Sequence, residues 1–351
     1  MSLPTKTRAW VLANKPKDHA ILSGPDATFK LETQELPPLQ DGQLLVQIQY
    51  LSNDPAQRGW IDADIQANRL YVAPVEVGET MRARGVCKIL SSKDSNFKEG
   101  DLVLGPGNWR EYAVVNTKEC QPVMDIPGVS PTQFLGALGG TGLTAYVGLV
   151  ENVGVKKGES LVVSGAAGAT GSMVVQIAKH IVGCSKVIGL AGTDEKCRWV
   201  ESLGADKCIN YKSPDWKDQL TRATDPFVDI YFDNVGGETL DLMLTRLKTH
   251  GRVSSCGAIS DYNKGEKYGL KNYFEVIMQR LQIKGFIVMD YLTEGRGAKF
   301  TKILADATRE GKLKVGEENE TVVDTKFEDV PKTWVKLFEG GNQGKLVTHI
   351  V

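Results

Sequence analysis

Three glycines at three-residue spacing, Gly165, Gly168 and Gly171, follow an apolar run and precede an apolar segment with helical periodicity. The usual G-x-G-x-x-G pattern has a glycine where this chain has Ala166. Gly168 would still let the backbone approach a pyrophosphate, and Gly171 would let a helix pack closely on the strand before it. The helix N-terminus would add N–H donors and the positive end of its dipole. The pattern predicts a phosphate-binding turn, with a ligand-free tight turn as the alternative.

The residues after the next apolar strand indicate which dinucleotide binds. An NAD site usually ends its second strand with an acidic residue, which binds the adenosine ribose. This chain has Gly192 there, and Lys196 follows in the first turn of the next helix. Lys196 would pair with a 2′-phosphate; a lysine on a solvated helix face is the alternative. Asp194 and Glu195 argue against an anion here, but acidic residues are also ordinary in the first turn of a helix. We therefore expect NADP(H) rather than NAD.

Histidine and cysteine side chains are too scattered for a catalytic or structural zinc ion. The histidines are His19, His180, His250 and His349. None of them has a cysteine or histidine neighbour at ligand spacing, so we expect no metal. The cysteines are Cys87, Cys120, Cys184, Cys197, Cys208 and Cys256. They form no C-x-x-C pair, which indicates reduced thiols and a cytoplasmic protein.

The elements that must position these residues show two patterns. The first third contains short β-rich runs separated by turn residues, typical of a compact, largely antiparallel barrel-like domain. From about Gly158, near-continuous apolar strands alternate with helical stretches, which predicts a parallel, doubly wound sheet covered on both faces. The tail is mixed again, and we expect its terminal strand to pair within the N-terminal domain. The prediction is a β-rich substrate domain of residues 1–131 and 306–351, interrupted by a nucleotide-binding α/β domain of residues 132–305.

Bulk properties exclude several classes of partner. The chain has 351 residues and a formal net charge of -1, so nothing suggests nucleic acid or an anionic membrane. Its first residues lack the apolar core of a signal peptide, and no run approaches the roughly 20 apolar residues of a membrane span. We therefore expect a protein that acts on small molecules, with no nucleic acid and no membrane as partner.

Several motifs together resemble one family over nearly the whole length. They are YLSNDPAQRG (Tyr50–Gly59), TGLTAYVGL (Thr141–Leu149), SGAAGATGS (Ser164–Ser172), AGTDEK (Ala191–Lys196), NYK (Asn210–Lys212), FDNVGG (Phe232–Gly237), CGAISDYN (Cys256–Asn263) and GNQGKLV (Gly341–Val347). The chain resembles a zinc-independent medium-chain dehydrogenase/reductase, in the branch of prostaglandin reductase (leukotriene B4 12-hydroxydehydrogenase), plant alkenal double-bond reductases and bacterial curcumin reductase. The resemblance implies a Rossmann-type NADP(H) domain inserted in a GroES-like domain, and a homodimer.

The resemblance also implies site residues. Those matching the family's cofactor contacts are Gly168, Ala169, Thr170, Gly171, Gly192, Lys196, Tyr211, Asn234, Cys256, Tyr262, Phe286, Ile287, Val288 and Asn342. Phe286–Val288 match a strand whose backbone meets the nicotinamide amide and which pairs across the dimer. In the substrate pocket we expect Tyr50, Asn53, Ala56 and Arg58, although Tyr50 and Arg58 could equally be structural. The family often has an aromatic residue where this chain has Ala56, so a stacking surface is lost there.

The activity implied is NADPH-dependent reduction of the carbon–carbon double bond of an α,β-unsaturated aldehyde or ketone. It needs a hydride at the β-carbon, a donor at the carbonyl oxygen, and a proton at the α-carbon. Tyr262 is the best side-chain donor, with a structural or cofactor-positioning role as its alternative. The proton could come from water, and the ribose 2′-hydroxyl could also donate. A quinone reductase and a non-catalytic NADPH-binding structural protein stay open as alternatives.

Overall fold

The computed structural model describes residues 3–293 and 295–351. The chain divides into a β-rich unit, which contains the residues up to Leu135 and Glu320–Val351, and an α/β unit, Gly136–Asn319. The sequence predicted boundaries at 131/132 and 305/306; in the structure residues 132–135 lie in the β-rich unit and residues 306–319 lie in the α/β unit. The side chain of Gln176 explains the second difference, because it accepts from the Lys314 N–H at 2.7 Å and donates to the Lys314 carbonyl at 3.2 Å.

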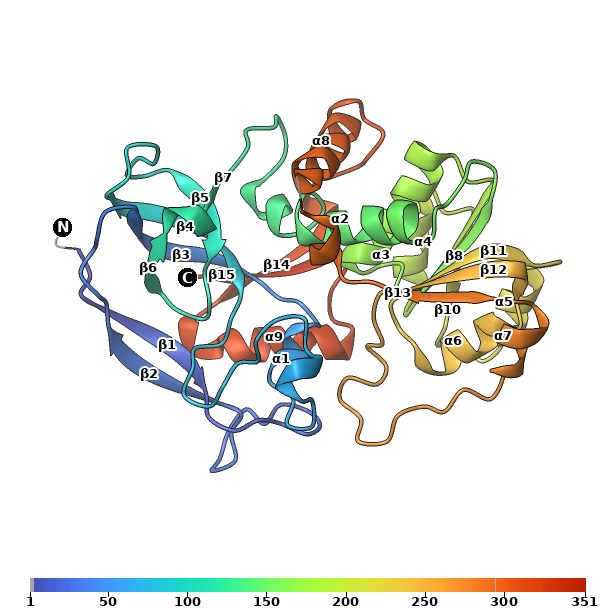
Figure 1. The fold of residues 1–351 in the computed structure, drawn as a ribbon, viewed down its shortest axis with the longest axis horizontal. Coiled ribbons are helices and arrows are strands. Elements are labelled where there is room, and N and C mark those ends of the chain that lie inside the picture. Colours follow the sequence, from blue (N-terminus) through green and yellow to red (C-terminus); the bar gives the residue numbers. More distant parts are fainter. Residues whose placement is uncertain (1–2, 294) are drawn as a thin grey trace. The chain divides into compact units, whose positions relative to one another are not determined.

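The β-rich unit contains the strands predicted for the first third and the tail of the chain (Figure 1). They are β1 (Lys6–Leu12), β2 (Phe29–Glu35), β3 (Gln43–Ser52), β4 (Arg84–Ser92), β5 (Leu102–Pro106), β6 (Tyr112–Asn116), β7 (Gln121–Pro122), β14 (Glu320–Thr325) and β15 (Lys345–Ile350). Two short helices accompany them, α1 (Gln57–Trp60) and α9 (Val330–Glu339). The pairing is antiparallel except between β14 and β15.

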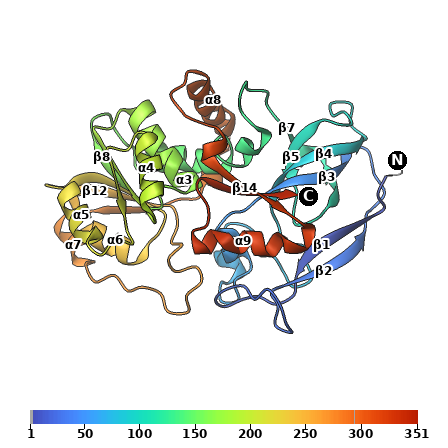
Figure 2. The same ribbon diagram turned by 180° about the vertical axis from the view of Figure 1, so that it is seen from behind.

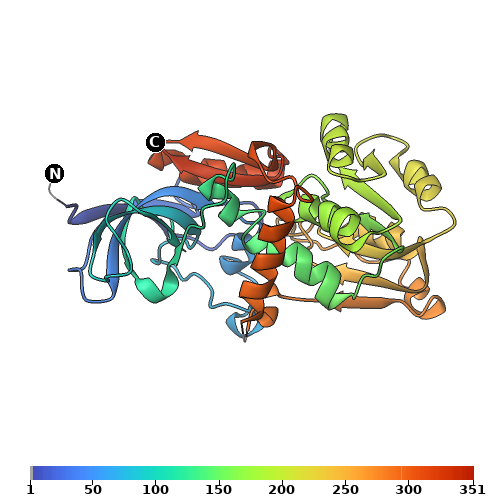
Figure 3. The same ribbon diagram turned by 90° about the horizontal axis from the view of Figure 1, so that it is seen from above.

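The C-terminal strand pairs as expected within the N-terminal sheet. The strand order is β14-β15-β3-β4-β5-β7, and β6 also pairs with β3. Thr348 of β15 lies opposite Leu51 of β3. Figure 3 shows the red C-terminal strands against the blue strands of this sheet.

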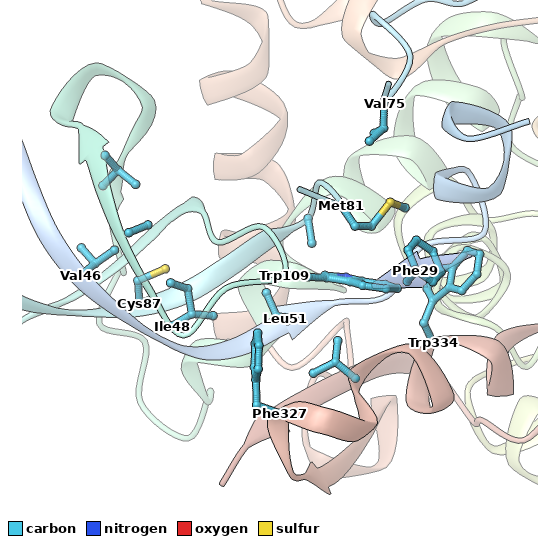
Figure 4. Close-up of a cluster of buried hydrophobic side chains, with 14 of the residues drawn as sticks. Phe29, Val46, Ile48, Leu51, Val75, Met81, Cys87, Trp109, Phe327 and Trp334 are labelled. Carbon is cyan, nitrogen blue, oxygen red and sulfur yellow. The ribbon is translucent and has the colours of Figure 1, made fainter. Parts of the chain in front are cut away.

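Aromatic side chains from distant segments form the core of the β-rich unit. The rings of Phe29 and Trp109 lie 4.7 Å apart, and Trp334 of α9 packs edge-on against both at 5.9 Å (Figure 4). Trp109 and Trp334 are fully buried. Because such large rings bury much apolar area, this contact holds α9 onto β2 and onto the segment between β5 and β6.

The α/β unit is built on a parallel sheet in the order β10-β9-β8-β11-β12-β13. Its strands are β8 (Ser160–Val163), β9 (Lys186–Ala191), β10 (Lys207–Asn210), β11 (Val228–Asp233), β12 (Leu247–Ser255) and β13 (Gln282–Gly285). Its helices are α2 (Gly140–Tyr146), α3 (Ala169–Gln176), α4 (Asp194–Ser202), α5 (Trp216–Ala223), α6 (Gly237–Leu244), α7 (Phe274–Met278) and α8 (Arg296–Arg309). Figures 1 and 2 show α3 and α4 on one face of the sheet and α5 and α6 on the other. Both faces are therefore covered, which explains the near-continuous apolar strands and confirms the predicted fold class.

One predicted strand is shorter than expected. β13 ends at Gly285, and Phe286 and Ile287 lie outside it, while Val288 begins a short helical turn. The ring of Phe286 packs edge-on against Phe232 with centroids 6.4 Å apart. The prediction of a strand through Val288 is therefore wrong, because the chain leaves the sheet edge where Phe286 packs against Phe232.

Candidate dinucleotide site and substrate residues

Predicted cofactor residues of the α/β unit stand directly after the ends of its strands. Gly192 follows β9, Tyr211 follows β10, Asn234 follows β11, Cys256 follows β12 and Phe286 follows β13. The glycine turn follows β8 in the same way. Because the strands are parallel, their carboxyl ends meet at one edge, which is where α/β sheets bind ligands.

The glycine turn has the close backbone approach that the sequence predicted. Gly165 has a φ of +59°, in the left-handed region that favours glycine. A Cβ on Gly171 would lie 2.2 Å from the Gly165 carbonyl oxygen, so a side chain at position 171 would push the helix off the strand. Gly168 is the N-cap residue of α3, and as a glycine it has no side chain that could accept a hydrogen bond from the first turn of this helix. The first-turn N–H groups of Ala169 and Thr170 have no acceptor within the helix, and this cradle fits a pyrophosphate.

The segments after β9 and β10 meet at Gly192. A Cβ on Gly192 would lie 2.8 Å from the hydroxyl oxygen of Tyr211, so the tyrosine occupies the space that a side chain would take. The Thr193 hydroxyl caps α4 by accepting from the Lys196 N–H at 3.2 Å. Lys196 is half-buried, and burial, followed by the positive charge of Lys212, lowers the pKa of its ammonium. A partly desolvated cation beside a second one favours an anion as its partner.

Asn234 is held against the glycine turn. Its Nδ2 donates to the Ser164 carbonyl at 2.7 Å, and its N–H donates to the Ser164 hydroxyl at 3.0 Å. Asp233 before it is buried and accepts from the N–H groups of Val235 and Gly236 at 3.0 and 2.9 Å. Burial raises the pKa of the Asp233 carboxyl, although these donors act in the opposite direction. These hydrogen bonds fix the turn between β11 and α6 beside the glycine turn that follows β8.

Cys256 and Tyr262 lie in the long loop after β12. Burial raises the pKa of the Cys256 thiol to about 12, so this cysteine is a neutral thiol at physiological pH. The hydroxyl oxygen of Tyr262 accepts a hydrogen bond from the Ala258 N–H at 3.3 Å. A Cβ on Gly257 would lie 3.0 Å from the same oxygen. The tyrosine therefore folds back onto the start of its own loop.

In the β-rich unit, the predicted substrate residues are mostly engaged in the fold. Tyr50 stacks on His349 with ring centroids 4.6 Å apart. Asn53 is buried, and its Nδ2 donates to the Thr348 hydroxyl at 2.9 Å. Arg58 is buried; it donates to the Asp62 carboxylate at 2.8 Å and to the carbonyls of residues 16–18. The predicted cofactor residue Asn342 donates to the Gly344 carbonyl at 2.8 Å.

Ala56 is exposed and is the N-cap residue of α1. Trp60 is four residues further along the same helix, and residues at this spacing share a face. Its Nε1 donates to the Tyr71 hydroxyl at 3.2 Å, and the Arg82 guanidinium lies 5.4 Å from a Trp60 ring centroid. An aromatic surface is therefore present one turn after the position where the family's aromatic residue is missing.

Two residues that position the sites, Lys345 and Asp233, lie within the quoted motifs, but the motifs do not indicate their roles. Lys345 is buried, and its Nζ donates to the Asn53 carbonyl at 2.8 Å and to Asp54 Oδ1 at 2.5 Å. These partners are about 290 positions away in the sequence, so no local pattern connects them. Asp233 stands in the motif FDNVGG, but only the structure shows that its carboxylate accepts from the N–H groups of the turn before α6.

Two observations concern membranes and metals. Among the helices of residues 3–293 and 295–351, none has the length and apolarity that a bilayer crossing requires. Over the same residues, no three His, Cys, Asp or Glu side chains gather as metal ligands would.

The fold and the strand-end site define a dinucleotide-binding oxidoreductase, and comparisons with known proteins identify its family. Residues 8–123 match the family model described as "N-terminal domain of oxidoreductase", and residues 169–307 match the one described as "Zinc-binding dehydrogenase". The chain belongs to the zinc-independent branch of the medium-chain dehydrogenases/reductases that contains prostaglandin reductase and curcumin reductase.

Individual relatives span almost the whole chain. It is 37% identical to prostaglandin reductase 1 of Bos taurus, over 97% of this chain and 98% of that protein. It is 34% identical to the NADPH-dependent curcumin reductase of Escherichia coli, over 98% and 97%. The crystal structure of CurA in complex with NADPH from Vibrio vulnificus has a TM-score of 0.85 at 33% identity, covering 98% of this chain and 99% of that one.

Proposed function

We propose that the protein uses NADPH to reduce the carbon–carbon double bond of α,β-unsaturated aldehydes and ketones. The observation that carries this proposal is that Gly192, Asn234, Cys256 and other candidate cofactor residues directly follow the carboxyl ends of parallel strands. Its relatives include a prostaglandin reductase and an NADPH-dependent curcumin reductase, each matching over nearly its whole length. When bound, NADPH supplies a hydride for the β-carbon of the substrate.

The cofactor residues have distinct roles in this proposal. Gly168–Gly171 bind the pyrophosphate, and Gly192, Lys196 and Tyr211 bind the adenosine phosphate. Cys256, Tyr262 and the backbone of Phe286–Val288 bind the nicotinamide half, and Asn234 and Asn342 are further cofactor contacts. Phe286–Val288 lie outside β13, but their backbone can still bind the nicotinamide amide. Such a contact does not require these residues to pair with a neighbouring strand.

Tyr262 stabilises the negative charge that develops on the substrate carbonyl oxygen. The hydrogen bond from the Ala258 N–H to its oxygen stabilises negative charge on the phenol, which makes the hydroxyl a better donor. In this role Tyr262 is the catalytic residue of the chain.

The β-rich unit supplies the substrate residues. Asn53 and Arg58 hold the segment that carries Ala56, because their polar groups bind Thr348 and the loop of residues 16–18. Ala56 leaves room for a bulky enone, and Trp60 and Tyr71 offer aromatic surface beside it. Tyr50, stacked on His349, forms a wall of the same pocket.

We also propose that the protein is a cytoplasmic homodimer. β13 is an edge strand, and all its residues are exposed. The neighbouring α7 region exposes Tyr273, Phe274 and Ile277, at 57%, 65% and 61%. An open edge beside large apolar side chains is the kind of surface that a second copy covers. All six cysteines are free thiols, which suits a reducing compartment.

An NADPH-consumption assay with product identification tests the activity. Simple enals, enones and a bulky aromatic dienone should give products with a reduced C=C bond and an intact carbonyl. Tyr262→Phe should lower kcat roughly 100-fold while NADPH still binds. Oxygen-dependent cycling with quinones and no reaction with enones would instead identify a quinone reductase. NADPH binding without turnover on any acceptor would identify a structural protein.

A further inference from the structure

Asn210, the last residue of β10, connects two segments that each carry a lysine. Its Nδ2 donates to Asp194 Oδ1 in the first turn of α4 at 2.8 Å. Its Oδ1 accepts from the Lys212 N–H at 3.0 Å. Both polar atoms of the amide are therefore engaged, one on each segment, and the amide sets the start of α4 relative to the residues after β10.

The two lysines joined in this way influence each other. Lys196 stands in the first turn of α4, two residues after Asp194, and is half-buried. Lys212 is close enough for its charge to lower the pKa of Lys196. Two cations at one place repel each other unless an anion lies between them, and a phosphate dianion accepts hydrogen bonds from both.

Asp194 is the residue that would oppose such an anion. Its carboxylate lies in the same helical turn as Lys196 and would repel a phosphate if it could turn freely. The hydrogen bond keeps the Asp194 carboxylate bound to the side-chain amide of Asn210, at the end of β10. This accounts for Asp194, one of the two acidic residues beside the lysine expected to bind a phosphate; the charge of the other, Glu195, acts to raise the pKa of Lys196.

We infer that Asp194, Asn210 and Lys212 form a selectivity clasp for NADP(H). In this clasp Lys212 is a second cation on the 2′-phosphate, and Asn210 is a positioning residue that restrains Asp194. The inference rests on the cofactor assignment of the proposed function. It adds two residues, Asn210 and Lys212, to the contacts already proposed for Gly192, Lys196 and Tyr211.

Calorimetric binding of adenosine 2′,5′-bisphosphate and 5′-AMP to the cofactor-free protein tests the clasp without any reaction. Lys212→Gln should raise the Kd of the bisphosphate about ten-fold and leave the Kd of 5′-AMP unchanged, since a lost charge-assisted hydrogen bond has about that effect. Asn210→Ala should raise the bisphosphate Kd similarly. Adding Asp194→Asn to it should recover most of the loss, because the unrestrained charge is then gone. Lys207→Gln, at the opposite end of β10, serves as the control and should change neither Kd.

Other outcomes overturn the inference. Equal weakening of both ligands by Asn210→Ala, or no recovery with Asp194→Asn, would show that Asn210 only maintains the fold. An unchanged bisphosphate Kd in Lys212→Gln would remove Lys212 from the phosphate. A wild-type protein that binds both ligands equally would refute the clasp and the NADPH assignment together. A preserved bisphosphate preference without enone reduction would refute the proposed reaction alone.

Discussion

The hydroxyl oxygen of Tyr211 occupies the space of the side chain that Gly192 lacks, 2.8 Å from where a Cβ would stand. A methyl group at position 192 would displace the tyrosine from the adenosine end of the site. We expect Gly192→Ala to weaken NADPH binding several-fold with little loss of thermal stability, because Tyr211 is half-exposed and can move. Fluorescence titration with NADPH measures the effect. Tyr211→Phe in the Gly192→Ala background should recover part of the affinity; a further loss would mean that the hydroxyl itself binds the cofactor.

Lys196 should make cofactor selectivity depend on pH. Its pKa is lowered by burial and by Lys212, and only the protonated ammonium attracts a phosphate. The preference for NADPH over NADH should therefore decline on raising the pH, beginning below the value of about 10.4 for a free lysine. Lys212→Gln removes the repulsion, so the decline should move to higher pH. Dissociation constants measured at constant ionic strength check this, and an unshifted profile would contradict it.

Gly148 should not tolerate the alanine that helices usually prefer. It follows α2, and a Cβ there would lie 2.4 Å from the Phe286 ring and 2.7 Å from the Phe232 ring. We expect Gly148→Ala to reduce the free energy of unfolding by about 1–3 kcal/mol through overpacking. Gly140→Ala in α2 is the matched control, since no atom lies within 4 Å of its Cβ position. Denaturant unfolding compares the two, and Phe286→Leu should relieve the Gly148→Ala defect.

The ion pair of Lys345 and Asp54 should contribute more than a surface pair does. The Lys345 side chain is 3% exposed and that of Asp54 is 32% exposed. Lys345→Met leaves the Asp54 carboxylate without its buried partner, and we expect a loss of about 2–4 kcal/mol in unfolding free energy. Adding Asp54→Asn should restore part of it. Lys302→Met breaks an exposed pair with Asp306 and should have an effect close to the error of the measurement.

The apolar surface of α7 and β13 gives a direct test of the dimer. Phe274→Glu introduces a charge on the most exposed ring of this surface. Light scattering coupled to size-exclusion chromatography should show a monomer for this variant at concentrations where the wild type is a dimer. Val77→Glu, at a residue 60% exposed in the β-rich unit, is the control and should stay dimeric. A dimeric Phe274→Glu protein would place the interface elsewhere.

Much of the fold could be predicted from the sequence, because the patterns that indicate strands and turns are local. Near-continuous apolar runs ended at Gly192, Asn234 and Cys256, and the structure has a strand end before each of them. The glycine turn was readable for the same reason, since close approach at Gly171 needs a residue without a side chain. The spacing of residues along the chain is enough to predict the local structure wherever a strand, a turn and a helix follow one another.

Contacts between distant segments could not be read in this way. For Arg58 the sequence left a pocket residue and a structural arginine equally open; its guanidinium binds backbone carbonyls of residues 16–18, which no pattern links to it. The apolar residues Phe286–Val288 are also compatible with a strand. Only the packing of Phe286 against Phe232 takes this residue away from the edge of the parallel sheet. Tertiary contacts decide such cases, because a side chain's partner depends on the whole fold.

The position of β15 between β14 and β3 has a consequence for how the protein is made. The ribosome releases Lys345–Ile350 only after the entire α/β unit, which is contiguous and can fold while the chain is still attached. One edge of β3 stays unpaired until these residues have been synthesised, because Tyr50, Leu51 and Ser52 pair with them. Until then this stretch of β3 is an open strand edge, which could pair with another chain.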